Sequence, residues 1–185
     1  MQSKEQLEQF YQSVDPWGYQ TCQDDLVRKD IILKEIKGKF KKALDIGAGE
    51  GWITKDLPAD NIYALEISDN ASKRLPSNVE RIKELDGKYD LIIATGVLYK
   101  EYDYEELNRI INEHACGLVV TCNIKPLEIN KITLPLIKEF DFPYREYVEH
   151  LAIYEVPPPT QHRDTQPQQL QPKKRGRKPK GNTDL

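Results

Sequence analysis

The clearest chemical pattern in the chain is a set of closely spaced glycines flanked by two acids. Gly47, Gly49 and Gly51 alternate with other residues directly after Asp45. Glycine lets the backbone turn sharply and approach a bound group without a Cβ in the way. Glu66 follows Asp45 by 21 residues, about the spacing at which an acid on the next parallel strand can hold ribose hydroxyls. The pattern therefore predicts a ligand that carries a ribose.

Two other interpretations of the glycines stay open on spacing alone. Any tight turn between a strand and a helix favours glycine, so the segment could be only a turn. A nucleotide-dependent oxidoreductase would also place glycines and a ribose-binding acid here, in the order G-x-G-x-x-G. The order from Asp45 to Gly51 is D-x-G-x-G-x-G instead, which argues against the oxidoreductase.

The elements that must position this loop follow from apolar periodicity and from breakers. The run at 42–46 predicts a strand before the glycines, and the continuous apolar run at 91–94 predicts a central strand covered on both faces. Strands are also expected at 61–67, 79–85, 117–121, 144–150 and 151–156, the last two as an antiparallel pair. Helices are expected at 3–12, 23–37, 50–57, 69–75, 103–114 and 128–140, the last kinked at Pro135.

These residues carry a resemblance to a known family. The loop from Asp45 to Gly51, followed by Glu66, resembles motif I and the acidic motif II of class I S-adenosylmethionine-dependent methyltransferases. Residues 89–99 resemble the family's fourth strand and the loop after it, and 15–19 resemble the N-terminal signature of its nodulation-protein-S-like branch. The resemblance spans roughly residues 10–156. It implies an α/β, Rossmann-like fold whose seven-stranded sheet is mostly parallel with one antiparallel strand, with helices on both faces.

The resemblance also implies a cofactor and the residues that hold it. The cofactor would be S-adenosylmethionine. Its candidate contacts in and after the strands are Asp45, Gly47, Ala48, Gly49, Glu66, Ile67, Glu84, Leu85 and Thr95. In the resembled branch the N-terminal region closes over the cofactor, and the residues that could do so here are Tyr11, Trp17 and Tyr19. The alternative is that Trp17 and Tyr19 simply cap the core.

Methyl transfer from a sulfonium is an in-line displacement, so the protein mainly positions the reactants and, where needed, offers a base. Tyr99 and His150 are the catalytic candidates by location; His150 could instead be a polar residue at a strand end. No Asn/Asp-Pro-Pro-Tyr sequence follows the fourth strand, and no Pro-Cys nucleophile is present, which disfavours direct methylation of DNA bases. By analogy with the branch, we expect transfer to nitrogen or oxygen of a small-molecule or glycan-like acceptor.

Length and composition fit one domain with a tail. We expect a methyltransferase domain at 1–156, including an aromatic lid segment at 1–22, and a tail at 157–185. The chain has no long apolar run and no signal-peptide core, so we expect a soluble, cytoplasmic protein. Its three cysteines are odd in number and lack C-x-x-C spacing, so the sequence predicts neither a disulfide framework nor a zinc site.

The formal charge of −3 conceals an asymmetry between the domain and the tail. Residues 1–156 hold 20 Lys+Arg and 28 Asp+Glu, a balance of −8, whereas 157–185 hold 7 and 2, a balance of +5. The tail is rich in Pro and Gln and has no apolar period, so we expect it to be disordered. Near its end, an AT-hook-like segment is formed by Arg175, Gly176, Arg177, Lys178 and Pro179.

An AT-hook lays arginines in a narrow A·T minor groove. The segment departs from the usual form because Lys178 stands between Arg177 and Pro179. The tail therefore adds DNA as a possible partner, and a DNA-associated methyltransferase or binding module tethered by the tail is the alternative function. A solubilising tail, or one that binds polyanions generally, stays open as well.

Overall fold

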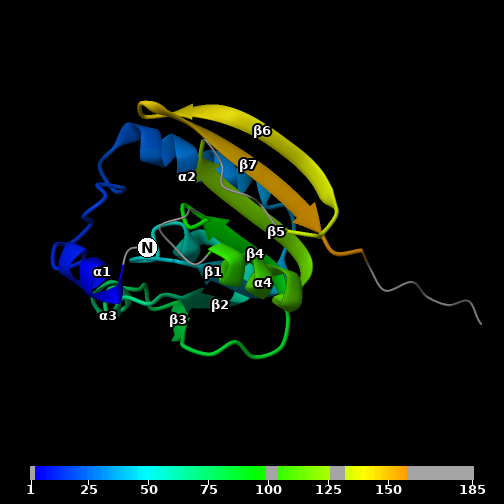
Figure 1. The fold of residues 1–185 in the computed structure, drawn as a ribbon, viewed down its shortest axis with the longest axis horizontal. Coiled ribbons are helices and arrows are strands. Elements are labelled where there is room, and N and C mark those ends of the chain that lie inside the picture. Colours follow the sequence, from blue (N-terminus) through cyan, green and yellow to red (C-terminus); the bar gives the residue numbers. More distant parts are fainter. Residues whose placement is uncertain (1–2, 99–103, 126–131, 158–185) are drawn as a thin grey trace, which may run out of the picture.

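The computed structural model describes residues 3–98, 104–125 and 132–157. Within these ranges the chain forms short helices around a single sheet (Figure 1). The helices are α1 (Lys4–Phe10), α2 (Gln23–Glu35), the 3₁₀ turn η1 (Thr54–Asp56), α3 (Asp69–Ser72) and α4 (Tyr104–His114). The strands are β1 (Phe40–Ile46), β2 (Ala59–Leu65), β3 (Val79–Ile82), β4 (Tyr89–Thr95), β5 (Ala115–Ile124), β6 (Leu136–Tyr144) and β7 (Tyr147–Glu155).

The sheet has seven strands in the order β3-β2-β1-β4-β5-β7-β6. Strands β1 to β5 run parallel to their neighbours, whereas β7 is antiparallel to both β5 and β6. The predicted mostly parallel sheet with one reversed strand is therefore confirmed. The chain leaves β1 toward β2 and β3 on one side, and β4 and β5 lie on the other side. Ligands of open α/β sheets bind at such a reversal, outside the carboxyl ends of the strands.

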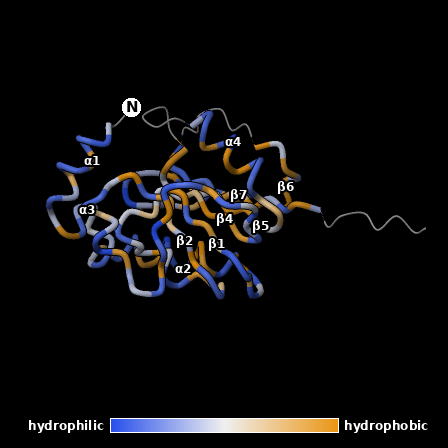
Figure 2. The backbone as a smooth tube through the Cα atoms, turned by 90° about the horizontal axis from the view of Figure 1, so that it is seen from below, coloured by the Kyte–Doolittle hydropathy of each residue, from blue (hydrophilic) through white to orange (hydrophobic). Residues whose placement is uncertain are grey.

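Apolar residues on alternate positions of the central strands build two cores, one on each face. On one face, Ile32 of α2 packs in a cluster with Ala43 and Ile93. On the other face, Ile111 of α4 packs in a cluster with Leu44. Figure 2 shows the apolar central strands between α2 and α4. Both faces are covered, as continuous apolar runs in parallel strands require, so the prediction of helices on both faces is confirmed.

The prediction of a helix at 50–57 is wrong. The chain instead stays in turns after the glycine loop and forms only the 3₁₀ turn η1. Gly51 has φ +78, and a Cβ there would lie 2.7 Å from Cδ of Pro76. Its left-handed backbone prevents a helix from starting at this point.

The prediction of a helix at 128–140 is also wrong for residues 132–140, the part of this range that the structure describes. Residues 132–135 are not helical and lead into the edge strand β6, while 126–131 lie outside the described residues. Pro135 suits the start of an edge strand better than a helix interior. The antiparallel pair expected at 144–150 and 151–156 is consequently displaced: β6 pairs with β7, and Arg145, with φ 52, lies in the turn between them.

One further property concerns membranes. None of the helices in the described ranges combines the length and the apolar character that spanning a bilayer requires.

The close approach of β5 to β4 at Gly117 generates a stability prediction. A Cβ at this position would lie 2.3 Å from the carbonyl oxygen of Asp90. Because backbone atoms of a central strand pair cannot move aside easily, we expect Gly117→Ala to lower the free energy of unfolding by about 1–3 kcal/mol. Urea denaturation measures this change. The exposed neighbour Cys116 provides the control, since Cys116→Ala should stay within about 0.5 kcal/mol of the wild type. Equal stability of both variants would contradict the prediction.

Candidate functional site

A cavity of about 280 Å³ opens at the carboxyl ends of β1, β2 and β4. It lies where the strand order reverses, the position expected for a ligand of this class of sheet. Ten of the residues predicted from sequence line it: Tyr11, Trp17, Tyr19, Asp45, Gly47, Ala48, Gly49, Glu66, Ile67 and Thr95. The structure thus brings together residues that are separated by as many as 84 positions in the sequence, from 11 to 95.

The glycine loop forms the floor of this cavity. Gly47 and Gly49 have φ values of +72 and +56, a region that side-chain-bearing residues rarely adopt. A Cβ on Gly47 would lie 2.3 Å from Cγ1 of Val97, and one on Gly49 would lie 2.7 Å from the hydroxyl of Tyr11. Both positions therefore require glycine for conformation and for space.

Glu66 lies just beyond β2 and connects two loops. Its Oε2 accepts a hydrogen bond from the backbone N–H of Gly49, and its Oε1 accepts one from that of Ser68, both at 2.7 Å. Burial raises the pKa of this carboxyl group. Each carboxylate oxygen can accept a second hydrogen bond, so Glu66 can brace the loop and still accept from ribose hydroxyls.

Asp45 is the most deeply buried acid of the cavity. It is 3% exposed, and its Oδ2 accepts a hydrogen bond of 2.6 Å from Oγ1 of Thr54. Its Oδ1 is buried and has no hydrogen-bond partner in the described part of the chain. Burial raises the pKa of Asp45 to about 7. A buried carboxylate oxygen without a donor is costly, so this oxygen suits a donor or cation supplied by a ligand.

Three aromatic side chains from the N-terminal segment form one wall. Nε1 of Trp17 donates to the hydroxyl of Tyr11 at 3.1 Å, and the ring of Trp17 stacks on that of Tyr19 with an interplanar angle of 17°. The segment is anchored by Glu50, which accepts from the backbone N–H of Asp15 at 3.0 Å. The wall is therefore held by polar contacts as well as by packing.

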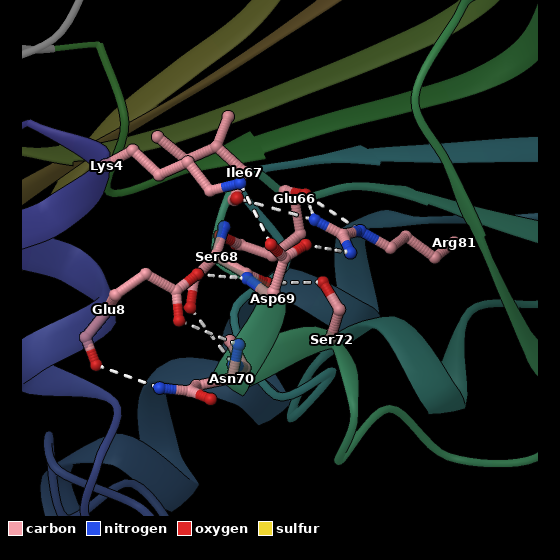
Figure 3. Close-up of polar contacts among 10 residues, drawn as sticks. Lys4, Glu8, Glu66, Ile67, Ser68, Asp69, Asn70, Ser72 and Arg81 are labelled. Atoms are coloured by element: carbon pink, nitrogen blue, oxygen red, sulfur yellow. Dashed lines mark hydrogen bonds and ion pairs between the residues drawn. The ribbon is translucent and has the colours of Figure 1, made fainter.

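Figure 3 shows the polar contacts that attach α1 to the segment after β2. The carboxylate of Glu8 accepts from the backbone N–H groups of Asp69 and Asn70 at the start of α3. Lys4 pairs with Asp69 at 2.9 Å. Arg81 in turn donates to the carbonyl oxygen of Glu66 at 2.9 Å. The N-terminal helix is thus fastened to the loop that carries the predicted ribose-binding acid.

Several residues that line the cavity were missed by sequence reasoning, chiefly Arg28, Trp52 and Val97. Arg28 lies on α2, is 6% exposed, and uses Nε to bind Glu149 of β7. No local pattern points to it, because its partner is 121 residues away. Val97 was detectable in principle, since it follows the fourth strand at the same sheet edge as the glycine loop.

Other predicted site residues lie elsewhere. Glu84 and Leu85 do not line the cavity, and Leu85 packs against the core cluster on the α4 side. His150 also does not line the cavity; its Nδ1 is 2.7 Å from Oδ1 of Asp141. Tyr99 lies outside the described residues, as do all five residues of the AT-hook-like segment, Arg175, Gly176, Arg177, Lys178 and Pro179.

Comparison with known proteins gives matches among solved structures only: no protein-family model and no curated protein matches the chain. The N-methyltransferase NodS from Bradyrhizobium japonicum WM9, in complex with S-adenosyl-L-homocysteine, is 16% identical, with a TM-score of 0.70 over 84% of this chain and 98% of NodS. Magnesium protoporphyrin IX methyltransferase (ChlM) from Synechocystis PCC 6803, with bound S-adenosylmethionine, is 15% identical, with a TM-score of 0.64 over 83% and 97%.

Coclaurine N-methyltransferase, bound to N-methylheliamine and S-adenosylhomocysteine, is a third similar structure. It is 12% identical, with a TM-score of 0.57 over 70% of this chain and 72% of its own. At these identities the likeness concerns the fold. Together with the strand order and the helices on both faces, it shows that this chain has the Rossmann-like fold of class I methyltransferases.

Proposed function

We propose that this chain is an S-adenosylmethionine-dependent methyltransferase that acts on nitrogen or oxygen of a small-molecule or glycan-like acceptor. The observation that carries the proposal is the single cavity in which the glycine loop, Glu66 and Asp45 meet at the switch point of the sheet. The similar structures support the choice of cofactor, since NodS, ChlM and coclaurine N-methyltransferase were solved with S-adenosylmethionine or S-adenosylhomocysteine. NodS and coclaurine N-methyltransferase are N-methyltransferases by name, which favours nitrogen.

The residues present fit such a cofactor. Glu66 has free acceptor capacity for ribose hydroxyls, beyond the two backbone N–H groups that it already binds. Oδ1 of Asp45 is a buried acceptor without a partner in the described residues, which suits a cationic or N–H-bearing part of the ligand. The glycine loop leaves room for close approach of the ligand to the backbone. When bound, the cofactor supplies an electrophilic methyl group on a sulfonium.

The chain's own contribution is to bind and orient the two reactants and to exclude water from them. Tyr11 is buried and Trp17 is half-buried, and both line the cavity, so the aromatic wall covers part of the cavity. Holding two reactants in line can supply several kcal/mol of the barrier reduction without a dedicated catalytic group. His150 is engaged by Asp141 and lies outside the cavity lining, which weakens its candidacy as a base. Tyr99 stays a candidate base, because it follows the cavity-lining segment at 95–97 in sequence.

The tail supports a second candidate function, a DNA-associated methyltransferase or binding module. The observation that favours it is the charge split, −8 for residues 1–156 and +5 for 157–185. An acidic domain is repelled by nucleic acid, whereas a basic tail can bind phosphates by releasing counterions. On this proposal, DNA contact is confined to the tail.

The proposed cofactor is tested by calorimetric titration with S-adenosylhomocysteine and, separately, with NAD. We expect the first to bind and the second not to bind. Glu66→Ala should weaken binding by about 1.5–3 kcal/mol, because it removes charge-assisted hydrogen bonds. It should also lower stability, since two backbone N–H groups lose their acceptor.

Glu66→Gln and Glu80→Gln test whether Glu66→Ala weakens ligand binding through the lost hydrogen bonds or only through lower stability. The amide of Glu66→Gln keeps one acceptor oxygen, so it should bind better than Glu66→Ala. Glu80 is exposed on β3, and Glu80→Gln should bind as the wild type does. Binding of NAD alone, or of neither ligand at millimolar concentration, would refute the proposed cofactor.

The raised pKa of Asp45 generates a pH prediction. The group titrates at about 7 in the folded protein and at about 4 in an unfolded chain. Between these values the folded protein binds more protons, so this group makes the free energy of unfolding fall as the pH rises from about 4 to about 7. Asp45→Asn removes that titration. We compare the free energy of unfolding of Asp45→Asn with that of the wild type, both without ligand. As the pH rises from about 4 to about 7, the variant should gain on the order of 2–4 kcal/mol relative to the wild type, and the difference should stay constant at higher pH.

Urea denaturation at a series of pH values gives this difference. Asp60→Asn, at an exposed carboxyl of β2, controls for the loss of one negative charge. A difference between Asp45→Asn and the wild type that does not change with pH would contradict the prediction.

For the tail, we expect weak DNA binding that falls with salt. The basic cluster holds six cations: Lys173, Lys174, Arg175, Arg177, Lys178 and Lys180. If about five contact phosphate, the log–log salt slope should be near −4 to −5. Insertion of the arginines into the minor groove should add a preference for A·T-rich duplex.

Binding of the full chain, a chain ending at Val156 and the Arg175→Ala/Arg177→Ala double variant can be compared on A·T-rich and G·C-rich duplexes. Equal affinity for both duplexes would reject the AT-hook interpretation. Undiminished binding by the shortened chain would reject the tail as the contact.

A further inference from the structure

Thr54 lies behind the cavity and binds its most deeply buried acid. Thr54 is 0% exposed, and its Oγ1 donates to Oδ2 of Asp45 at 2.6 Å. Asp45 lines the cavity, whereas Thr54 does not. Any effect of this hydroxyl on a bound ligand must therefore pass through the carboxyl group of Asp45.

The turn after the glycine loop brings the two side chains together. The backbone N–H of Lys55 donates to the carbonyl oxygen of Gly51 at 3.2 Å, and that of Leu57 donates to the carbonyl oxygen of Thr54 at 3.2 Å. The chain thus folds back after the glycines, and Thr54 returns to the end of β1, nine positions after Asp45. The contact is made from η1, the 3₁₀ turn that takes the place of the expected helix.

The hydroxyl gives the two oxygens of Asp45 different surroundings. Oδ2 accepts from Thr54, while Oδ1 is buried and has no partner among the described residues. Because a β-branched side chain has few rotamers, a fully buried threonine holds its hydroxyl in one place. The hydrogen bond therefore fixes the rotation of the carboxyl plane and leaves Oδ1 for a donor from the ligand.

The groups that act on Asp45 come from three other elements. Burial raises its pKa to about 7; the hydrogen bond from Thr54 of η1 opposes that rise, the charge of Glu66 adds to it, and the charge of Arg28 on α2 opposes it. Arg28 is itself paired with Glu149. A hydrogen bond donated to a carboxylate favours its charged form. The hydroxyl of Thr54 thus favours an ionised Asp45 near neutral pH, where a cationic ligand group needs a negative partner.

We propose that Thr54 is a positioning residue, which favours the ionised form of Asp45 and turns Oδ1 toward the ammonium group of the ligand in this cavity. The inference rests on the proposed function, because S-adenosylmethionine carries an ammonium group at its amino-acid end. Thr54 touches neither the ligand nor the reacting atoms, so it acts on the ligand only through Asp45.

The experiment measures the binding of S-adenosylhomocysteine and of 5′-methylthioadenosine by calorimetric titration at a series of pH values around neutrality. The second ligand has the same nucleoside thioether and lacks the amino-acid end. The ratio of the two dissociation constants therefore isolates the amino-acid end from the ribose, whose proposed partner Glu66 also has a raised pKa.

In the wild type, the preference for S-adenosylhomocysteine should rise with pH as Asp45 ionises, with a midpoint near its pKa of about 7. Thr54→Val removes the hydroxyl and keeps the branched shape. It should move this midpoint upward by about one pH unit and weaken S-adenosylhomocysteine up to about 10-fold near neutral pH, with 5′-methylthioadenosine unchanged. Thr54→Ser restores a donor and should return the midpoint to the wild-type value.

Two controls test whether the effect belongs to this contact. Thr121 is another buried threonine, 3% exposed, and does not line the cavity, so Thr121→Val should bind both nucleosides as the wild type does at every pH. In the Asp45→Asn background no carboxyl group titrates at this position. Adding Thr54→Val to that background should therefore leave the pH dependence of the ratio unchanged.

Several results would overturn the proposal. Equal weakening of both nucleosides by Thr54→Val indicates a structural role. A preference that does not change with pH in the wild type, a midpoint that Thr54→Val leaves unchanged, or a shift that persists in the Asp45→Asn background each contradicts an action through Asp45. If the wild type binds neither nucleoside, the proposed function fails and the inference with it. Normal binding by the wild type without the expected shift in the variants refutes the inference alone.

Discussion

The site depends on one buried carboxylate, that of Glu66, placed between two loops. Its oxygens accept the backbone N–H groups of Gly49 and Ser68, so the loop after β1 and the loop after β2 are tied to each other. Removing a carboxylate from water is costly, and two charge-assisted hydrogen bonds offset that cost. In the parallel register of β1 and β2, Ile46 pairs with Leu65. Both loops therefore begin at the same edge of the sheet. A ligand at this edge thus meets a preformed surface.

Carboxylate contacts to backbone N–H groups also attach the N-terminal helix. Glu8 caps the backbone N–H groups of Asp69 and Asn70 (Figure 3). Leu7 lines the cavity. The pair between Lys4 and Asp69 is about half exposed on both sides, so it contributes little stability by itself. The attachment of α1 therefore depends more on the carboxylate of Glu8 and on apolar packing than on this ion pair.

A second anchor is the buried charge network behind the cavity. Arg28 and Glu149 join α2 to β7, and Asp25 and Arg145 join α2 to the turn between β6 and β7. Arg145 also donates to the carbonyl oxygen of Trp17 at 2.9 Å, which links the hairpin to the aromatic wall. Buried ion pairs repay their desolvation only when their geometry is good, and breaking one partner is strongly destabilising. The network therefore fixes the positions of α2 and the aromatic wall more than it adds stability.

The sequence by itself determined the parts of this protein that depend on local chemistry. The apolar runs of β1 and β4, the glycines at 47 and 49 and the spacing to Glu66 follow from short-range rules on burial on both faces and on positive φ. They were enough to predict the central strands and the glycine loop that lines the cavity, whereas the seven-stranded sheet was implied by the family resemblance. Only the tertiary structure decided that 136–144 is an edge strand, because pairing with β7 overrides the local helical pattern. It also decided that Arg28 lines the cavity, because its counterion Glu149 is 121 residues away. No spacing rule reaches that far, and the contact exists only once the sheet brings α2 and β7 together.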